Sequence, residues 1–171
     1  MELAELGRRI YATAHLTGEF VLRSGQTTSE YFDKYRFEAD PVLLDAVAEA
    51  MVPLVSADTE VLAGLEMGGI PVVTALGRHT GLPCAFVRKQ AKPYGTRRLA
   101  EGAETAGRRV TIVEDVVTTG GQIVLSATDL RALGAHITDA LCVINRNATT
   151  PAPLTEAGLT LTALLTPEHL G

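Results

Sequence analysis

Residues 110–122 have the sequence Val110-Thr111-Ile112-Val113-Glu114-Asp115-Val116-Val117-Thr118-Thr119-Gly120-Gly121-Gln122. The first four residues are apolar or β-branched and predict a buried strand over 110–113. Two adjacent carboxylates follow at the predicted end of this strand, and a loop rich in hydroxyl groups and glycine comes next. Apolar residues then recur at helical spacing, at Ile123, Ala127 and Leu130. The stretch therefore predicts a strand, an acidic pair, an anion-binding loop and a helix, in that order.

The chemistry of this stretch indicates the kind of ligand that it binds. Successive backbone N–H groups over 117–121, the Thr118 and Thr119 hydroxyls and the start of a helix form a set of donors that suits a phosphate. Glu114 and Asp115 would repel that phosphate, so we expect them to face the vicinal hydroxyls of a sugar. The loop has neither the Walker pattern nor the glycine pattern of dinucleotide-binding proteins. The predicted ligand is therefore a sugar phosphate.

The composition is typical of a soluble globular protein. The chain has 171 residues, of which 46% are hydrophobic and 20% charged, so we expect one domain with a sizeable core. No apolar run reaches the length of a membrane span, and the acidic N-terminus differs from a signal peptide, which favours the cytoplasm. Cys84 and Cys142 lie in apolar, strand-like runs and are expected to be buried thiols. The histidines show no metal-ligand spacing, so no protein metal site is predicted.

The net charge of −5 argues against a general nucleic-acid-binding protein. The positive charge is nevertheless concentrated in one region of the sequence. Seven of the 15 lysines and arginines lie there: Arg88, Lys89, Lys92, Arg97, Arg98, Arg108 and Arg109. A local field of this kind suits a small polyanionic ligand.

The N-terminal part of the chain predicts a helix followed by a hairpin. Residues 2–14 carry apolar side chains at helical spacing. Residues 18–25 and 28–33 predict two short strands that pair with each other. We expect this part, about 1–38, to form a small hood beside the main core of the domain.

Strands alternate with helices in the rest of the chain, about 40–165. Asp40 and Pro41 are typical of a helix N-terminus, and this helix is predicted to end near residue 56. The elements predicted after it are a strand at 61–65, a helix at 71–80, strands at 84–88 and 110–113, a helix at 121–134 and strands at 137–145 and 159–165. The alternation predicts an α/β fold with a central parallel sheet flanked by helices, and a ligand at the carboxyl ends of the strands. No linker divides the chain, so a single domain is expected over 1–171.

Two segments resemble a known family. Residues 110–122 resemble the phosphoribosyl pyrophosphate (PRPP) motif of the type I phosphoribosyltransferases. The segment Arg88-Lys89-Gln90-Ala91-Lys92-Pro93-Tyr94-Gly95-Thr96 has no apolar periodicity and predicts a mobile loop. It resembles the catalytic loop of orotate phosphoribosyltransferases, Arg-Lys-x-x-Lys-x-His-Gly. In that family the loop covers the active site of the other subunit of a dimer, and its lysine stabilises the departing pyrophosphate.

Three further matches occur in the order of the family. Leu22-Arg23-Ser24-Gly25, followed by Tyr31-Phe32, resembles a Leu-Lys-Ser-Gly motif and the paired aromatic residues of the orotate pocket. Gly69-Ile70-Pro71 resembles the pyrophosphate-binding turn, and Arg146 stands where the family places an arginine against orotate. The chain departs from the family pattern at three places: Tyr94 replaces a histidine, Arg23 replaces a lysine, and Met67-Gly68 replaces a frequent Tyr-Lys.

The resemblance implies a type I phosphoribosyltransferase fold with an N-terminal hood, and a homodimer in which the mobile loop is shared between subunits. It implies that orotate and PRPP, with Mg²⁺ carried by PRPP, are converted to orotidine 5′-monophosphate and pyrophosphate in pyrimidine biosynthesis. The expected catalytic residues are Lys92, Glu114 and Asp115. The residues expected to bind PRPP are Arg23, Arg88, Lys89, Lys92, Tyr94, Glu114, Asp115, Val116, Val117, Thr118, Thr119, Gly120, Gly121 and Gln122. The residues expected to bind orotate are Tyr31, Phe32, Thr118 and Arg146.

Two other functions are compatible with the same motif. One is transfer of the phosphoribosyl group to another nucleobase, such as a purine or uracil. An arginine such as Arg146 favours orotate, because it pairs with a carboxylate. The other is a non-catalytic regulator that senses PRPP. The intact Lys92 loop and the lack of a DNA-binding segment argue against this alternative, and neither nucleic acid nor a membrane is expected as a partner.

Overall fold

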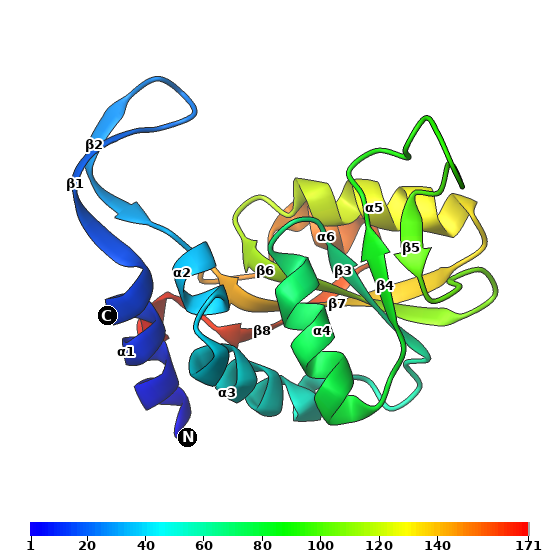
Figure 1. The fold of residues 1–171 in the computed structure, drawn as a ribbon, viewed down its shortest axis with the longest axis horizontal. Helices are drawn as coiled ribbons and strands as arrows, with labels where there is room; N and C mark the ends of the chain where they lie inside the picture. Colours follow the sequence, from blue (N-terminus) through cyan, green and yellow to red (C-terminus); the bar gives the residue numbers. More distant parts are fainter. Residues whose placement is uncertain (171) are drawn as a thin grey trace.

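The computed structural model describes residues 1–170, which form a central sheet covered by helices on both faces (Figure 1). Gly171, the last residue of the predicted domain, lies outside the described residues. The sheet has six strands within 1–170, in the order β5-β4-β3-β6-β7-β8. Their bounds are Val61–Leu65 (β3), Cys84–Val87 (β4), Ala100–Gly102 (β5), Arg109–Val117 (β6), His136–Asn145 (β7) and Thr160–Leu165 (β8).

The predicted parallel sheet is confirmed for five of these strands. Neighbouring strands from β4 to β8 in the sheet order run parallel. The short edge strand β5 pairs antiparallel with β4 and is not predicted by the sequence pattern. The carboxyl ends of the five parallel strands therefore meet at one edge of the sheet, where ligands bind in folds of this kind.

The sheet divides the hydrophobic core into two layers, and helices cover each layer. One face of the sheet is covered by α1 (Leu3–Ala14), α3 (Pro41–Met51) and α4 (Gly69–Thr80), and the other by α5 (Gly121–Ala132) and α6 (Ala152–Glu156). Alternate residues of a strand point to opposite faces, so neighbouring β6 residues enter different layers. Val113 packs with α1, α3 and α4, whereas Ile112 packs with α5 and α6. Among the helices of residues 1–170, none has the length and apolar character needed to cross a membrane.

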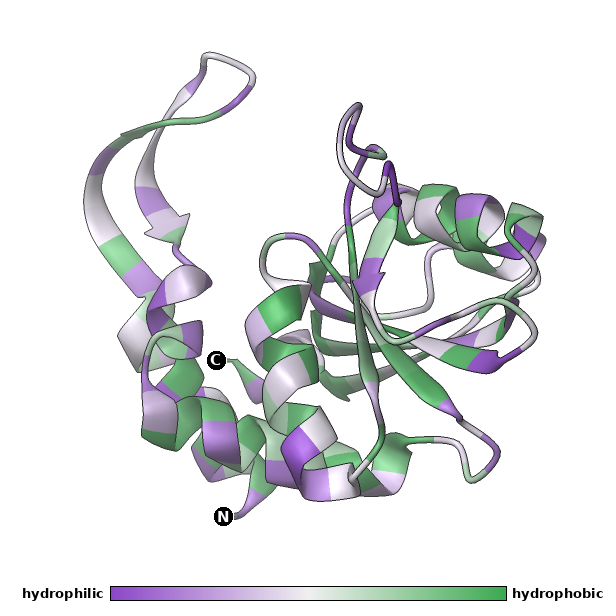
Figure 2. Ribbon diagram, turned by 45° about the vertical axis from the view of Figure 1, so that its right-hand side comes forward, coloured by the Kyte–Doolittle hydropathy of each residue, from purple (hydrophilic) through white to green (hydrophobic). Residues whose placement is uncertain are grey.

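The N-terminal segment forms the predicted helix and hairpin. Helix α1 leads into the antiparallel strands β1 (His15–Val21) and β2 (Thr27–Phe32). The hairpin projects away from the sheet, as Figures 1 and 2 show. A short helix that the sequence pattern does not predict, α2 (Tyr35–Glu38), returns the chain to α3, and its Phe37 is fully buried in the core. The base of the hood is therefore fixed to the core, while the hairpin turn is exposed.

Several predicted boundaries were wrong for identifiable reasons. Helix α3 ends at Met51 and continues only as a 3-10 turn over Val52–Leu54, because Pro53 has no N–H to extend the α-helical pattern. Strand β6 continues to Val117, so the acidic pair lies within the strand rather than after it. Helix α4 begins at Gly69, before the predicted start at 71.

The two cysteines differ in burial. Cys142 on β7 is fully buried, as predicted. Cys84 is only partly buried, which corrects the prediction, and its thiol contacts the Val73 carbonyl oxygen at 3.3 Å. Burial raises the pKa of both thiols, so neither is a reactive thiolate at neutral pH.

The start of α3 gives a prediction of stability. Oδ1 of Asp40 accepts hydrogen bonds from the backbone N–H groups of Val42 (2.9 Å) and Leu43 (3.1 Å). We expect Asp40→Ala to lower the free energy of unfolding by about 1 kcal/mol, because the N-cap acceptor is lost. Thermal or urea unfolding measures this change.

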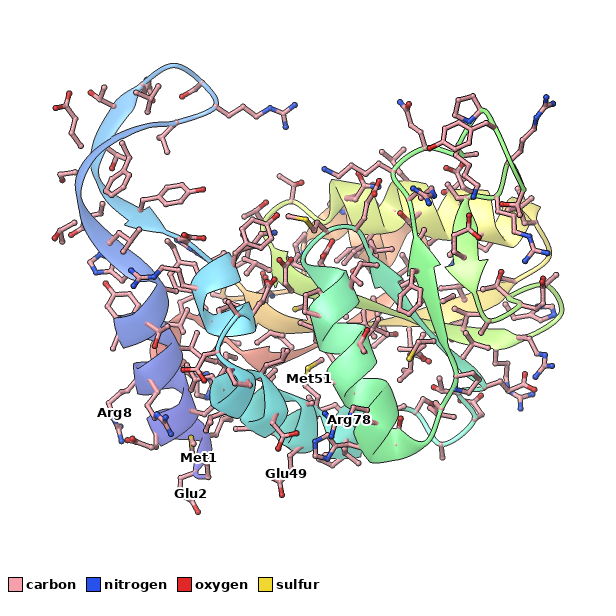
Figure 3. All side chains as sticks on the ribbon, in the orientation of Figure 1. Met1, Glu2, Arg8, Glu49, Met51 and Arg78 are labelled. Atoms are coloured by element: carbon pink, nitrogen blue, oxygen red, sulfur yellow. The ribbon has the colours of Figure 1, made fainter. Side chains whose placement is uncertain are left out.

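The matched control is Glu49→Ala on the same helix. The Glu49 side chain is exposed and points away from the sheet (Figure 3). This substitution should change the free energy of unfolding by less than about 0.5 kcal/mol. Equal effects of the two substitutions would contradict the role assigned to the Asp40 cap.

Candidate active site

The acidic pair lies in the centre of the sheet. Glu114 and Asp115 belong to β6, which is flanked by β3 and β7, and the side chain of Asp115 has 0% exposure. Oδ1 of Asp115 accepts a hydrogen bond from the Val116 N–H at 2.6 Å, and Oε1 of Glu114 accepts one from the Asp115 N–H at 3.1 Å. A buried carboxylate is costly unless it is paired, so the surroundings must supply a cation or donors.

The cation comes from the hood. Nζ of Lys34, just before α2, lies 2.7 Å from Oδ2 of Asp115, and the Lys34 side chain is one-third exposed. Sequence analysis missed Lys34, because nothing in the local pattern around it indicates a partner on a strand far along the chain. The ion pair connects the hood directly to the acidic pair.

A third carboxyl group completes the cluster. Glu38 on α2 is buried, and its two carboxyl oxygens receive no hydrogen bond within residues 1–170. Burial, reinforced by the neighbouring Asp115, raises the pKa of Glu38 to about 9. Burial and the charge of Asp115 likewise raise the pKa of Glu114 to about 9. Both groups are therefore protonated at neutral pH in the unliganded chain.

Asp115 carries the negative charge of the cluster. Burial alone would raise its pKa, but the Lys34 ion pair and the neighbouring Glu38 and Glu114 carboxyl groups outweigh burial and hold the pKa of Asp115 below its usual value. Burial would lower the pKa of Lys34, but the pairing with Asp115 raises it. At neutral pH the cluster therefore contains one carboxylate, one ammonium and two protonated carboxyl groups.

The predicted anion loop follows directly. The backbone N–H groups of Thr118, Thr119 and Gly120 find no acceptor among residues 1–170, and a cavity of about 90 Å³ opens beside them. Gly120 has φ +78°, and a Cβ there would lie 2.8 Å from Cγ of Leu154. Glycine is required at 120, because a side chain would displace the loop from α6. Asn147 holds the other side by donating to the Thr118 carbonyl oxygen at 2.6 Å.

The predicted pyrophosphate turn lies against the same strand. A Cβ at Gly69 would be 2.6 Å from the Val113 carbonyl oxygen, so the turn after β3 touches β6. A cavity of about 500 Å³ extends from this turn to the basic loop, and Arg88 and Glu101 are among the residues that line it. The structure therefore brings residues of the turn, Ile70 and Pro71, and Arg88 to one cavity.

Lys92 and Lys89 of the basic loop contact other residues of the same chain. Nζ of Lys92 lies 2.8 Å from Oε1 of Glu101 on β5, and this contact lowers the pKa of Glu101. The Lys89 N–H donates to Oε1 of Glu66 at 2.5 Å, and Tyr94 is largely exposed. Within residues 1–170, Lys92 makes no ion pair with Glu114 or Asp115. The structure does not bring the predicted catalytic lysine and the acidic pair together within one chain.

The predicted orotate-binding residues lie largely together. A cavity of about 490 Å³ is lined by Tyr31, Phe32 and Arg146, and Cζ of Arg146 lies 5.3 Å from the centre of the Phe32 ring. Thr118 lines the anion loop cavity instead. Arg23 lies in the exposed hairpin turn and lines none of these cavities. The remaining lining residues are Tyr11, His15, Thr28, Glu30, Pro167 and Leu170.

The raised pKa of Glu38 predicts how stability depends on pH. Its carboxyl keeps a proton in the folded state up to about pH 9 but loses it near pH 4.5 when unfolded, so its contribution to stability is lost as pH rises between these values. Glu38→Gln cannot lose a proton. The free energy of unfolding should therefore fall less steeply in this variant, by up to about 1.4 kcal/mol per pH unit.

Unfolding curves measured across this pH range provide the test. Glu49→Gln, on the exposed face of α3, is the matched control and should keep the slope of the parent chain. If Glu38→Gln also keeps that slope, Glu38 is not protonated in the folded state.

Known proteins with similar sequences are phosphoribosyltransferases. A family model described as phosphoribosyl transferase domain matches residues 36–158. An orotate phosphoribosyltransferase of Nocardioides sp. is 50% identical over 167 residues, which are 98% of this chain and 93% of the relative. That of Halobacterium salinarum is 41% identical over 153 residues, which are 90% of this chain and 87% of the relative.

A solved structure agrees along the whole chain. It is orotate phosphoribosyltransferase of Mycobacterium tuberculosis in complex with PRPP, with a TM-score of 0.82, 29% sequence identity and coverage of 99% of this chain and 98% of that chain. The central sheet, the helices on its two faces and the acidic strand with its loop thus belong to a known arrangement. The chain is a member of the orotate phosphoribosyltransferase family and has the type I phosphoribosyltransferase fold.

Proposed function

We propose that this chain transfers the phosphoribosyl group of PRPP to orotate, giving orotidine 5′-monophosphate and pyrophosphate in pyrimidine biosynthesis. The proposal depends most on the buried acidic pair of β6, followed at once by a loop with three backbone N–H groups that find no acceptor within residues 1–170. The Asp115 carboxylate and the Glu114 carboxyl group can both hydrogen-bond to the hydroxyls of a ribose, and the loop suits its 5′-phosphate. The names of the relatives, and the PRPP bound to the M. tuberculosis enzyme, support this choice of substrates.

The reaction requires stabilisation of opposite charges. The orotate ring nitrogen forms a bond to the anomeric carbon while the bond from that carbon to pyrophosphate breaks. Positive charge then develops on the ribose and negative charge on the leaving group. Asp115 and Glu114 are assigned to the ribose, and residues 118–122 to the 5′-phosphate. Arg88, Lys89 and Lys92 are assigned to the pyrophosphate, where a cation acts most strongly as the bond breaks.

Orotate is assigned to the cavity beside the hairpin. Arg146 offers a guanidinium for the carboxylate or carbonyl oxygens of the base, and the neighbouring Phe32 ring offers a flat apolar surface. A base that lacks a carboxylate would leave the Arg146 charge without its partner. The cavity therefore supports orotate over uracil or a purine.

Magnesium is proposed to arrive with PRPP. Within residues 1–170 no group of three or more His, Cys, Asp or Glu side chains is arranged to hold a metal ion, and Asp115 is already paired with Lys34. The phosphate oxygens of PRPP are the hard ligands that Mg²⁺ prefers. When bound there, the ion neutralises part of the leaving-group charge. We place the reaction in the cytoplasm, since both substrates are anions that do not cross a membrane unaided.

A direct spectrophotometric assay tests the function. We expect orotate to be consumed, as a fall in its ultraviolet absorbance, only when PRPP and Mg²⁺ are both present, and excess EDTA should abolish turnover. Uracil, adenine and hypoxanthine under the same conditions are the controls. Turnover of one of these bases in place of orotate would assign the chain to another nucleobase, and PRPP binding without turnover would indicate a regulator.

We propose further that the chain acts as a homodimer in which each mobile loop serves the neighbouring subunit. Lys92 pairs with Glu101 of its own chain, and its loop projects above β4 and β5, on the opposite side of the molecule from the hood hairpin (Figure 1). Because Lys92 is paired with Glu101 here, we expect it to contribute to catalysis only after the loop closes. Lys92→Ala should therefore lower kcat by two or more powers of ten, roughly 3 kcal/mol.

Mixing two inactive variants tests the sharing of the loop. Lys92→Ala and Asp115→Asn should each be nearly inactive alone. After subunit exchange, each heterodimer contains one site with both native groups, so the mixture should recover up to about a quarter of the parent activity if pairing is random. A mixture that stays inactive after verified exchange would show that the loop acts in cis.

The matched control mixes the parent chain with a chain that carries both substitutions. If the loop acts on the neighbouring subunit, only parent homodimers are active, and about a quarter of the parent activity is expected. If the loop acts in cis, each heterodimer keeps one active site and about half is expected. The two mixtures together distinguish the arrangements independently of the absolute rates.

A further inference from the structure

Three elements meet at one oxygen atom, Oδ2 of Asp115. Lys34 approaches it from the hood at 2.7 Å, and β6 supplies the carboxylate itself. The third element is the turn before α4, where a Cβ added to Gly68 would lie 1.6 Å from the same oxygen. Gly68 has φ −66° and ψ −30°, a conformation open to any residue, so glycine is needed here for space alone. The absence of a side chain at Gly68 thus leaves room for the Asp115 carboxylate, and Lys34 of the hood pairs with the same carboxylate.

No titratable neighbour of Asp115 other than Lys34 supplies a positive charge within residues 1–170. The titratable groups that face Asp115 are Lys34 and Glu38 from the hood, Glu114 from the same strand, and Cys142 from β7. Lys34 alone among them is positive. Without it, Asp115 would share a buried site with two carboxyl groups and a thiol, and an unpaired buried carboxylate takes up a proton.

We propose that Lys34 is a positioning residue for the phosphoribosyl transfer, which keeps Asp115 ionised and oriented toward the ribose. This inference rests on the proposed function and extends it, because it makes part of the hood a requirement for the chemistry of the sheet. Lys34 acts through Asp115, whose carboxylate must accept hydrogen bonds from ribose hydroxyls. The Asp115 carboxylate has no exposed surface. Within residues 1–170, Lys34 is the only cation paired with it, and the Lys34 side chain is one-third exposed.

The sign of the effect of pH follows from the ion pair. Lys34 favours the charged form of Asp115 and so lowers its pKa. Removing the ammonium raises that pKa, so the carboxylate needed for activity is lost at a higher pH. The acid limb of kcat/KM for PRPP reports groups of the free enzyme and should therefore move to higher pH. The titration of PRPP itself is the same for every variant and cancels in the comparison.

The experiment compares the pH dependence of kcat/KM for PRPP in the parent chain and three variants. Lys34→Met removes the charge, Lys34→Arg keeps it, and Arg36→Met removes an exposed cation from α2, the short helix that follows Lys34. We expect Lys34→Met to move the acid limb up by about one pH unit or more, with a loss of about tenfold on the acid side. Lys34→Arg and Arg36→Met should keep the limb of the parent chain.

Each outcome decides the proposal. A uniform loss in Lys34→Met, with the limb unmoved, would show that Lys34 only stabilises the fold, and unchanged kinetics would show that it has no role in the reaction. Thermal unfolding checks that Lys34→Met is folded. If it is not, Lys34→Gln, which keeps a hydrogen-bond donor but lacks the charge, replaces it in the same pH comparison. A parent chain that is inactive with orotate and PRPP overturns the proposed function instead, so the two failures are distinguishable.

Discussion

The burial of Asp115 in the centre of the sheet is the constraint on which the rest of the site depends. A carboxylate in this position loses its hydration, and a single uncompensated charge would destabilise the fold strongly. The chain compensates with a lysine from the hood, a backbone N–H from Val116 and the protonated carboxyls of Glu38 and Glu114. The hood, the central strand and the glycine turn are therefore parts of one electrostatic arrangement.

The features that could be predicted from sequence are those that local patterns determine. The order of strand, acidic pair, loop and helix over residues 110–122 indicated the fold and the ligand class together, because each part has its own local signal. The N-cap at Asp40 and the alternation of strands and helices were equally visible. The matches between 22 and 32, at 69–71 and at 146 added the family, and the structure places Tyr31, Phe32 and Arg146 at one cavity.

What sequence analysis missed depends on contacts between distant segments. The sequence around Lys34 and Glu38 shows no motif. The two residues come next to Asp115 only when the segment containing α2 packs against β6. The end of β6 was placed too early, because two acidic residues normally favour a loop, whereas here buried partners let the strand continue through them. The edge strand β5 is short and pairs with β4 only after the basic loop turns back. Arg23 was assigned by resemblance, and the exposed hairpin turn leaves it away from the cavities.

Residues 31–38 form one short stretch of chain that serves two ligands. Tyr31 and Phe32 line the cavity assigned to the base, and Lys34 and Glu38 contact the carboxylate assigned to the ribose. A displacement of this stretch by one ligand changes the site of the other, and thermodynamic linkage requires the effect on affinity to be reciprocal. The two substrates are therefore expected to bind cooperatively or antagonistically rather than independently, with the backbone between Phe32 and Lys34 as the physical connection.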